Sequence, residues 1–156
     1  MNEDFEDILA LLLEHQAEFL IVGAYALAVH GVARATGDID ILVRPTRSNA
    51  ERVCDALREF GAPLGLHGVG PDELSTEGNV YQLGLPPRRI DILTEIDGVS
   101  YDEAWKGRVT VDKGELRLPF LGKDELVKNK TEAARPKDLA DIALLDDANQ
   151  RDPGTE

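Results

Sequence analysis

Residues 38–43 have the sequence Asp-Ile-Asp-Ile-Leu-Val, and this stretch constrains the fold more than any other. Successive side chains of a strand point to opposite faces, so Asp38 and Asp40 share one face and the two isoleucines share the other. Along the strand the two carboxylates are about 7 Å apart, and like charges at this spacing repel each other. A divalent metal ion is the simplest counter-ion for such a pair. The pattern therefore predicts a half-buried strand with a charged site on one face.

The residues ahead of this strand predict a strand, a sharp turn and a helix. The run Phe19–Val22 is wholly apolar and stops at Gly23, which favours a short buried strand followed by a turn. Ala24–Val29 is made of small and apolar residues, as expected for a helix packed closely on a sheet. Gly31 stands where a helix commonly ends. A strand–turn–helix unit is therefore expected just before the charged strand.

Strand-like and helical segments continue along the chain and predict an α/β (α+β) fold, a mixed β-sheet flanked by helices with further helices at the C-terminal end. We expect one domain over residues 1–150 and a flexible tail over 151–156. Asn2 is placed to cap the first helix, and residues 62–79, rich in glycine and proline, are expected to form a loop. The other expected elements are an amphipathic helix from Phe5, a helix with a capping-box spacing at Ser48–Glu51, a hairpin of Val80–Leu85 and Arg89–Thr94, a hairpin of Arg108–Val111 and Glu115–Leu118, and helices over Asp124–Ala134 and Lys137–Asp146.

The charge balance and the cysteine content narrow the function classes. The chain has 30 acidic and 17 basic residues, with a formal net charge of −13 at pH 7. Its overall field repels phosphate, which argues against a general binder of nucleic acid or of anionic membranes. The single cysteine, Cys54, cannot form an internal disulfide, which fits a reducing cytosol. The acidic first residues are unlike a secretory signal, and no apolar run approaches the roughly 20 residues of a membrane span, so we expect a cytoplasmic protein.

A third aspartate repeats the pattern on another strand. Asp91 lies between two isoleucines within Arg89–Thr94. If this strand neighbours the first, Asp38, Asp40 and Asp91 converge on one side of the sheet and form a site for Mg²⁺ or Mn²⁺, which favour oxygen ligands. Such a site suits nucleotidyl transfer, in which metal ions activate a hydroxyl and offset the charge of the leaving pyrophosphate. The carboxylate on the separate strand is also a candidate general base.

The alternative is that these aspartates form ordinary ion pairs at the ends of strands. Arg34, Arg44 and Arg89 are the nearest candidates for their partners. Two other uses of an Asp-x-Asp pair do not fit the sequence. A calcium loop of the EF-hand type needs a glycine and further oxygen ligands where Ile41, Leu42 and Val43 stand, and an aspartyl-phosphate phosphatase needs a threonine at the position of Leu42.

Taken together, the motifs resemble those of the DNA polymerase β superfamily of nucleotidyltransferases. The resemblance lies in Val22-Gly23-Ala24, in residues 34–42 (Arg-Ala-Thr-Gly-Asp-Ile-Asp-Ile-Leu) and in the third acidic strand residue, Asp91. Within that superfamily the chain looks most like small bacterial proteins related to abortive-infection toxins and to the minimal nucleotidyltransferases of toxin–antitoxin loci. Residues 129–142 are similar to the late signature of that group, a lysine followed by Arg-x-x-Asp.

The resemblance implies a set of site residues and cofactors. It implies Mg²⁺ or Mn²⁺ as the metal and a nucleoside triphosphate as the donor substrate. One departure is Ala24, because the superfamily usually has a serine there whose hydroxyl contacts the triphosphate. The residues implied are Asp38, Asp40 and Asp91 as catalytic residues and metal ligands, and Gly23, Ala24, Arg34, Thr36, Lys130 and Asp138 as nucleotide-binding residues.

Two functions follow as hypotheses. The first is a nucleotidyltransferase that moves a nucleoside monophosphate from a nucleoside triphosphate to a hydroxyl of an RNA or tRNA end, a protein side chain or a small molecule. Such a protein would act in a toxin–antitoxin or phage-defence system with a partner protein and without a membrane. The second is a partner-binding module, antitoxin-like, that keeps the fold with a weakened nucleotide site at Ala24. The three intact aspartates favour the enzyme.

Overall fold

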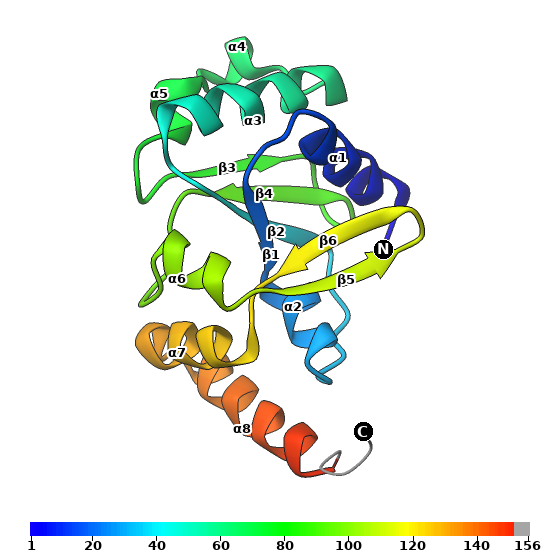
Figure 1. Cartoon of the computed structure of the whole chain (residues 1–156), viewed down its shortest axis with the longest axis vertical. Helices are drawn as coiled ribbons and strands as arrows, with labels where there is room; N and C mark the ends of the chain where they lie inside the picture. The colour runs from blue at the N-terminus through cyan, green and yellow to red at the C-terminus, as the bar shows by residue number, and fades with distance from the viewer. Residues whose placement is uncertain (152–156) are drawn as a thin grey trace.

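The computed structural model describes residues 1–151 of the chain and the side chains of residues 1–148. Its centre is a six-stranded mixed sheet with the strand order β3-β4-β2-β1-β6-β5 (Figure 1). The strands are β1 (Phe19–Val22), β2 (Asp38–Val43), β3 (Val80–Leu83), β4 (Arg89–Leu93), β5 (Val109–Lys113) and β6 (Leu116–Phe120). The helices are α1 (Glu3–Glu14), α2 (Gly23–Val29), α3 (Arg47–Phe60), α4 (Leu64–His67), α5 (Pro71–Leu74), α6 (Tyr101–Lys106), α7 (Lys123–Ala133) and α8 (Pro136–Arg151).

The strand β2 lies at the middle of the sheet, between β1 and β4. It pairs antiparallel with β1, with Val22 opposite Asp40, and parallel with β4, with Asp40 opposite Asp91. The turn that follows β1 therefore begins beside Asp40. The register places the glycine turn and the acidic residues of two strands at one place in the sheet.

Helices cover both faces of the sheet, and the alternation of β2 decides which of its side chains meets which layer. Ile39 and Ile41 are fully buried in a cluster with residues of α1 and α3. Leu42, on the other face, is buried with residues of α2, α6 and α7. Figure 1 shows α3 on one side of the sheet and α6 and α7 on the other. The aspartates alternate with the isoleucines, so they face the layer of α2, α6 and α7.

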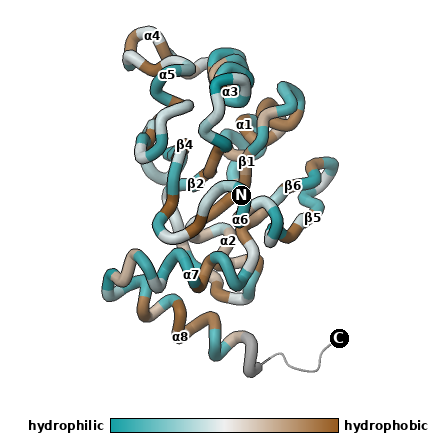
Figure 2. The backbone as a smooth tube through the Cα atoms, turned by 60° about the vertical axis from the view of Figure 1, so that its left-hand side comes forward, coloured by the Kyte–Doolittle hydropathy of each residue, from teal (hydrophilic) through white to brown (hydrophobic). Residues whose placement is uncertain are grey.

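The helices α7 and α8 form a pair at one end of the molecule, and α8 points away from the sheet in both views (Figures 1 and 2). Hydrophobic and hydrophilic stretches alternate along α8 in Figure 2. Leu145 is fully buried on the side toward the body, whereas Leu139 and Leu144 are exposed. The α8 helix is thus anchored along one side only.

The expected helix starts are confirmed at the first helix and corrected at the third. Asn2 caps α1, because its Oδ1 accepts a hydrogen bond from the Phe5 amide at 3.0 Å. The cap of α3 is Thr46 rather than Ser48, and it accepts a bond from the Asn49 amide at 3.4 Å. The Asn49 side chain is buried and bonds to both backbone groups of residue 18. This tertiary contact places Asn49 within the first turn, so the helix starts earlier than the capping-box spacing predicts.

Three short helices were not predicted. Residues 62–79 contain α4 and α5, which hold Leu64 and Leu74 in the core, so the expectation of a loop throughout is wrong. Helices of four residues are too short to show a 3.6-residue period. The helix α6 was also missed, although the capping-box spacing of Ser100 and Glu103 predicts a helix start there.

The predicted hairpins are confirmed as β3–β4 and β5–β6, with strand ends shifted by a few residues. The second hairpin turns at Gly114-Glu115, after Lys113 rather than around it. Of the predicted tail, Arg151 is the last residue of α8 and residues 152–156 lie outside the described residues. None of the helices within residues 1–151 has the length and apolar character needed to cross a bilayer.

Candidate active site

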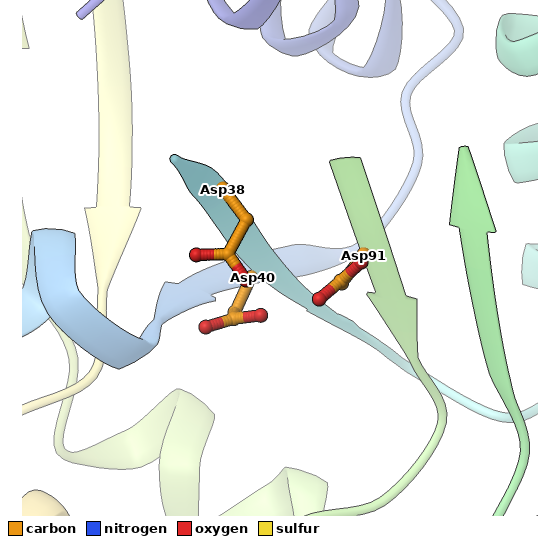
Figure 3. Close-up of side chains that lie close together, drawn as sticks. All are labelled: Asp38, Asp40 and Asp91. Atoms are coloured by element: carbon orange, nitrogen blue, oxygen red, sulfur yellow. The ribbon is translucent and has the colours of Figure 1, made fainter. Parts of the chain in front are cut away.

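Three carboxylates meet where β2 and β4 run side by side. Asp38 and Asp40 project from β2, and Asp91 projects from β4 toward them (Figure 3). One ligand atom from each of the three lies within 4.8 Å of the other two. The convergence predicted from the sequence is confirmed, since the two strands are parallel neighbours in the register that pairs Asp40 with Asp91.

Two neighbours fix the orientation of Asp38. The hydroxyl of Thr36 donates to its Oδ1 at 2.8 Å, and Nη2 of Arg89 donates to its Oδ2 at 2.7 Å. Burial by itself would raise the pKa of Asp38, but these hydrogen bonds and the charge of Arg89 outweigh it and hold the pKa below its ordinary value. Asp38 is therefore an ionised carboxylate with a defined position.

Asp40 and Asp91 have the opposite electrostatic surroundings. Burial, followed by the charges of Asp38 and Asp91, raises the pKa of Asp40 to about 7. The pKa of Asp91, a residue only 5% exposed, is also raised, chiefly by burial. The two residues lie opposite each other in the parallel register of β2 and β4, so their carboxyl groups are close neighbours. The protein thus holds more negative charge here than its own cations balance.

The three aspartates fit a divalent metal ion of the hard, oxygen-preferring kind. All the donors are carboxylate oxygens, the ligand type favoured by Mg²⁺ and Mn²⁺. Oδ1 of Asp91 is buried and accepts no hydrogen bond from any described group, so it has an unused lone pair. A bound cation would satisfy that oxygen and lower the raised pKa values of Asp40 and Asp91.

Gly23 is required by two separate features of the site. Its φ is +68°, a left-handed conformation that side chains rarely adopt. A Cβ added there would overlap the carboxylate of Asp40. The end of β1 can therefore approach Asp40 this closely only with glycine. The sequence predicts a turn at Gly23, and the resemblance implies that Gly23 approaches a triphosphate, whereas its contact with Asp40 depends on the pairing of β1 with β2.

A cavity of about 660 Å³ opens beside the two aspartates of β2. Its walls come from the turn at the start of α2, from residues 34–36, from the chain after β4 and from the α7–α8 junction. Asp91 and Asp138 do not line it. The predicted site residues that do are Gly23, Ala24, Arg34, Thr36, Asp38, Asp40 and Lys130.

Lys130 lies at the centre of a buried ion-pair network on the far wall. It is 7% exposed, and its Nζ is 2.9 Å from Oδ2 of Asp141 and 3.3 Å from Oδ1 of Asp138. Asp138 also accepts a hydrogen bond from Nε of Arg135 at 2.6 Å. This bond, together with other hydrogen bonds and the charge of Lys130, lowers the pKa of Asp138 to about 2 despite burial. Asp138 is fully buried behind Lys130, so its contacts are with these cations.

Asp141 and Arg135 belong to the site but were not among its predicted residues. Asp141 pairs with Arg34 as well as Lys130, so it links the loop before β2 to α8. The available signal was its spacing, since Asp138 and Asp141 are three residues apart and share a helix face. The alternative of ordinary ion pairs holds in part, because Arg89 pairs with both Asp38 and Asp91. The other two candidate arginines have different partners: Arg44 pairs with Glu18 and Asp102, and Arg34 pairs with Asp141.

Comparison with models of known protein families finds no match, and neither does comparison with curated proteins. Among solved structures, the chain matches a putative nucleotidyltransferase from Thermotoga maritima with a TM-score of 0.53 and 15% sequence identity. The match covers 94% of this chain and 88% of that one. At this identity the likeness is one of fold. It confirms the predicted fold class, so this chain has a mixed α/β fold of the nucleotidyltransferase type.

Proposed function

We propose that the protein is a metal-dependent nucleotidyltransferase that moves a nucleoside monophosphate from a nucleoside triphosphate to a hydroxyl acceptor. One observation carries the proposal: Asp38, Asp40 and Asp91 converge from two strands beside the turn at Gly23. Paired carboxylates at the edge of a cavity suit a donor that arrives with its metal ions, because Mg²⁺ keeps open positions for substrate phosphates.

The charges around the cavity support a triphosphate as its occupant. Arg34, Lys130, Arg135 and Lys137 all line it, alongside the acidic residues Glu95, Asp97 and Asp141. These cations could contact the phosphates of a metal–triphosphate complex, whose metal ion the aspartates would hold. A volume of about 660 Å³ is in the range of small-molecule and cofactor sites.

The transfer itself is a displacement at phosphorus. The acceptor oxygen forms a bond to the α-phosphorus, the bond from that phosphorus to the bridging oxygen of the β-phosphate breaks, and pyrophosphate leaves. Bound divalent ions would lower the pKa of the acceptor hydroxyl and offset charge on the pyrophosphate. Asp38 and Asp40 would hold these ions from one strand. Asp91 would hold an ion from the other strand and receive the proton of the hydroxyl.

The acceptor and the biological setting extend the same proposal. The net charge of −13 favours a short RNA end, a protein side chain or a small molecule over a long nucleic acid. A role in a toxin–antitoxin or phage-defence pair is supported by the late segment that resembles such proteins. Lys130, Arg135 and Asp138 of that segment form one connected network at the cavity.

The test is calorimetric titration of ATP, GTP, CTP and UTP, each with Mg²⁺ or Mn²⁺, into three proteins. These are the wild type, Asp40→Asn, and the control Asp55→Asn, which removes one charge from an exposed surface pair on α3. We expect metal-dependent binding of a triphosphate to the wild type and the control, and binding at least about tenfold weaker to Asp40→Asn. Incorporation of an α-phosphate label into candidate acceptors then tests transfer. Absence of binding to the folded wild type under every condition would refute the enzyme and favour the partner-binding module.

A further inference from the structure

Arg89 occupies the space between the carboxylates of the two strands. It lies opposite Asp38 in the parallel register of β2 and β4, so its side chain shares their face. Its Nη2 is 2.7 Å from Oδ2 of Asp38 and 3.2 Å from Oδ2 of Asp91. One guanidinium therefore bridges two of the three carboxylates. No other lysine or arginine with a described side chain forms an ion pair with the three aspartates.

The pairing is incomplete in both charge and geometry. One guanidinium faces three carboxyl groups, so ionisation of all three would leave two negative charges unbalanced, the charge of one divalent ion. Nε of Arg89 is 3.1 Å from Oδ1 of Asp91, yet the angle does not allow a hydrogen bond, and both atoms are buried without any other partner. Buried polar atoms that lack a bond are rare in folded proteins and costly. The ion pair of Arg89 with Asp91 therefore leaves hydrogen-bonding capacity of both residues unused.

The three carboxylates differ in their access to the cavity. Asp38 and Asp40 line it, whereas Asp91 does not and is 5% exposed. An ion that enters can reach the two aspartates of β2 directly. Both carboxylate oxygens of Asp91 already contact Arg89, so an ion that binds Asp91 as well competes with the guanidinium for them.

We propose that Arg89 is a displaceable counter-ion that competes with the metal ion for Asp38 and Asp91. The inference rests on the proposed function, since it concerns the metal site of that same reaction. In the metal-free protein Arg89 holds the two strands' carboxylates together. When a metal ion joins Asp91 to the β2 pair, Arg89 leaves, and the phosphates of a bound donor offer it another anion. The metal-free state is thereby stabilised at the expense of metal affinity.

A role as a simple scaffold predicts the opposite effect on metal binding. If Arg89 only orients the ligands, its removal weakens metal binding, as loss of an orienting partner commonly does by about 10- to 100-fold. If Arg89 competes with the ion, its removal strengthens binding. The repulsion between a guanidinium and a divalent ion about 4 Å apart corresponds to at least about a tenfold weaker Kd, even when it is screened as in bulk water.

The experiment is titration of Mn²⁺ alone, without nucleotide, into the wild type, Arg89→Gln, Arg89→Lys and Arg88→Gln. Arg88→Gln is a matched control, because it removes the same charge one residue away. The guanidinium of Arg88 pairs with Asp4 at the surface. We expect the Kd for Mn²⁺ to fall at least about tenfold in Arg89→Gln. It should stay near the wild-type value in the other two variants. Thermal unfolding should show a larger Mn²⁺-induced rise in Tm for Arg89→Gln than for the wild type.

The outcomes separate this inference from the proposed function. An unchanged or higher Kd in Arg89→Gln, with Mn²⁺ bound by the wild type, overturns the counter-ion role and leaves the metal site standing. Absence of Mn²⁺ binding to every variant overturns both. If Arg89→Gln is unfolded without metal, circular dichroism during the titration replaces calorimetry. Recovery of the fold at Mn²⁺ concentrations below the wild-type Kd supports the inference, and failure to recover overturns it.

Discussion

Asp40 is the carboxyl group that destabilises the metal-free fold most directly. Burial and the charges of Asp38 and Asp91 raise its pKa from 3.8 to about 7. Asparagine at this position keeps the size of the side chain and removes its charge. We expect Asp40→Asn, in the presence of a chelator, to be more stable than the wild type at neutral and alkaline pH. It should lose metal-dependent nucleotide binding at the same time.

The sign of the effect follows from proton binding by Asp40. Between about pH 4 and pH 7 the unfolded chain has released the proton of Asp40, whereas the folded protein still holds it. The stability that the folded protein gains by holding this proton is therefore complete below about pH 4. It falls as the pH rises and is lost above about pH 7, where the ionised Asp40 destabilises the fold. A pKa difference of about 3, at about 1.4 kcal/mol for each pKa unit, corresponds to about 4 kcal/mol across this range.

Urea unfolding at several pH values between about 4 and 8, always with a chelator, measures this directly. The free energy of unfolding of the wild type should fall relative to that of Asp40→Asn by up to about 4 kcal/mol over the range. Asp55→Asn, whose carboxylate lies on the surface of α3, should keep the wild-type pH dependence. Parallel curves for wild type and Asp40→Asn would refute the reasoning, as would an Asp40→Asn protein that is the less stable of the two near pH 8.

Two further substitutions test the surroundings of the site. Urea unfolding should show that Gly23→Ala lowers the free energy of unfolding by about 1–3 kcal/mol more than Gly114→Ala does. Both glycines have a positive φ, but only at Gly23 would an added Cβ overlap Asp40. Equal losses would show that backbone strain alone matters there. Lys130→Met should cost about 3–5 kcal/mol, because it leaves two buried aspartates of α8 without their shared cation. A loss below about 1 kcal/mol, typical of a surface pair, would contradict the buried network.

Much of the fold could be predicted because the decisive signals are local. The alternation in residues 38–43 predicted β2 and the face of each of its side chains, and Asn2 and Gly31 marked helix ends that the structure confirms. The errors fall where local signals are weak or are outweighed. The helices α4 and α5 are too short for a period to show, and the start of α3 depends on the bonds of Asn49 to a distant backbone.

The residues of the candidate site likewise include some that local signals predicted and others that depend on tertiary contacts. Strand alternation alone placed Asp38 and Asp40 together, and Asp91 was selected because its local sequence repeats theirs. Alternation places Arg89 on the same strand face as Asp91, two residues away, but no local rule gives the partners of Arg34 and Arg44. Their partners depend on which strands and helices are neighbours. The late motif likewise implied that Asp138 binds the nucleotide, whereas in the structure Asp138 is fully buried and pairs with Lys130.

The sequence by itself determined the chemistry available to this protein: three aspartates on strand-forming segments, a glycine turn and a late group of cations. These follow from local rules, because side-chain alternation and glycine conformation depend only on nearby residues. The tertiary structure decided which of these residues lie together and which partners they contact. The parallel pairing of β2 with β4 brings Asp91 beside Asp40, and it sets Arg89 between the carboxylates. Such contacts join residues about 50 positions apart, and long-range pairing is chosen by the packing of the whole core.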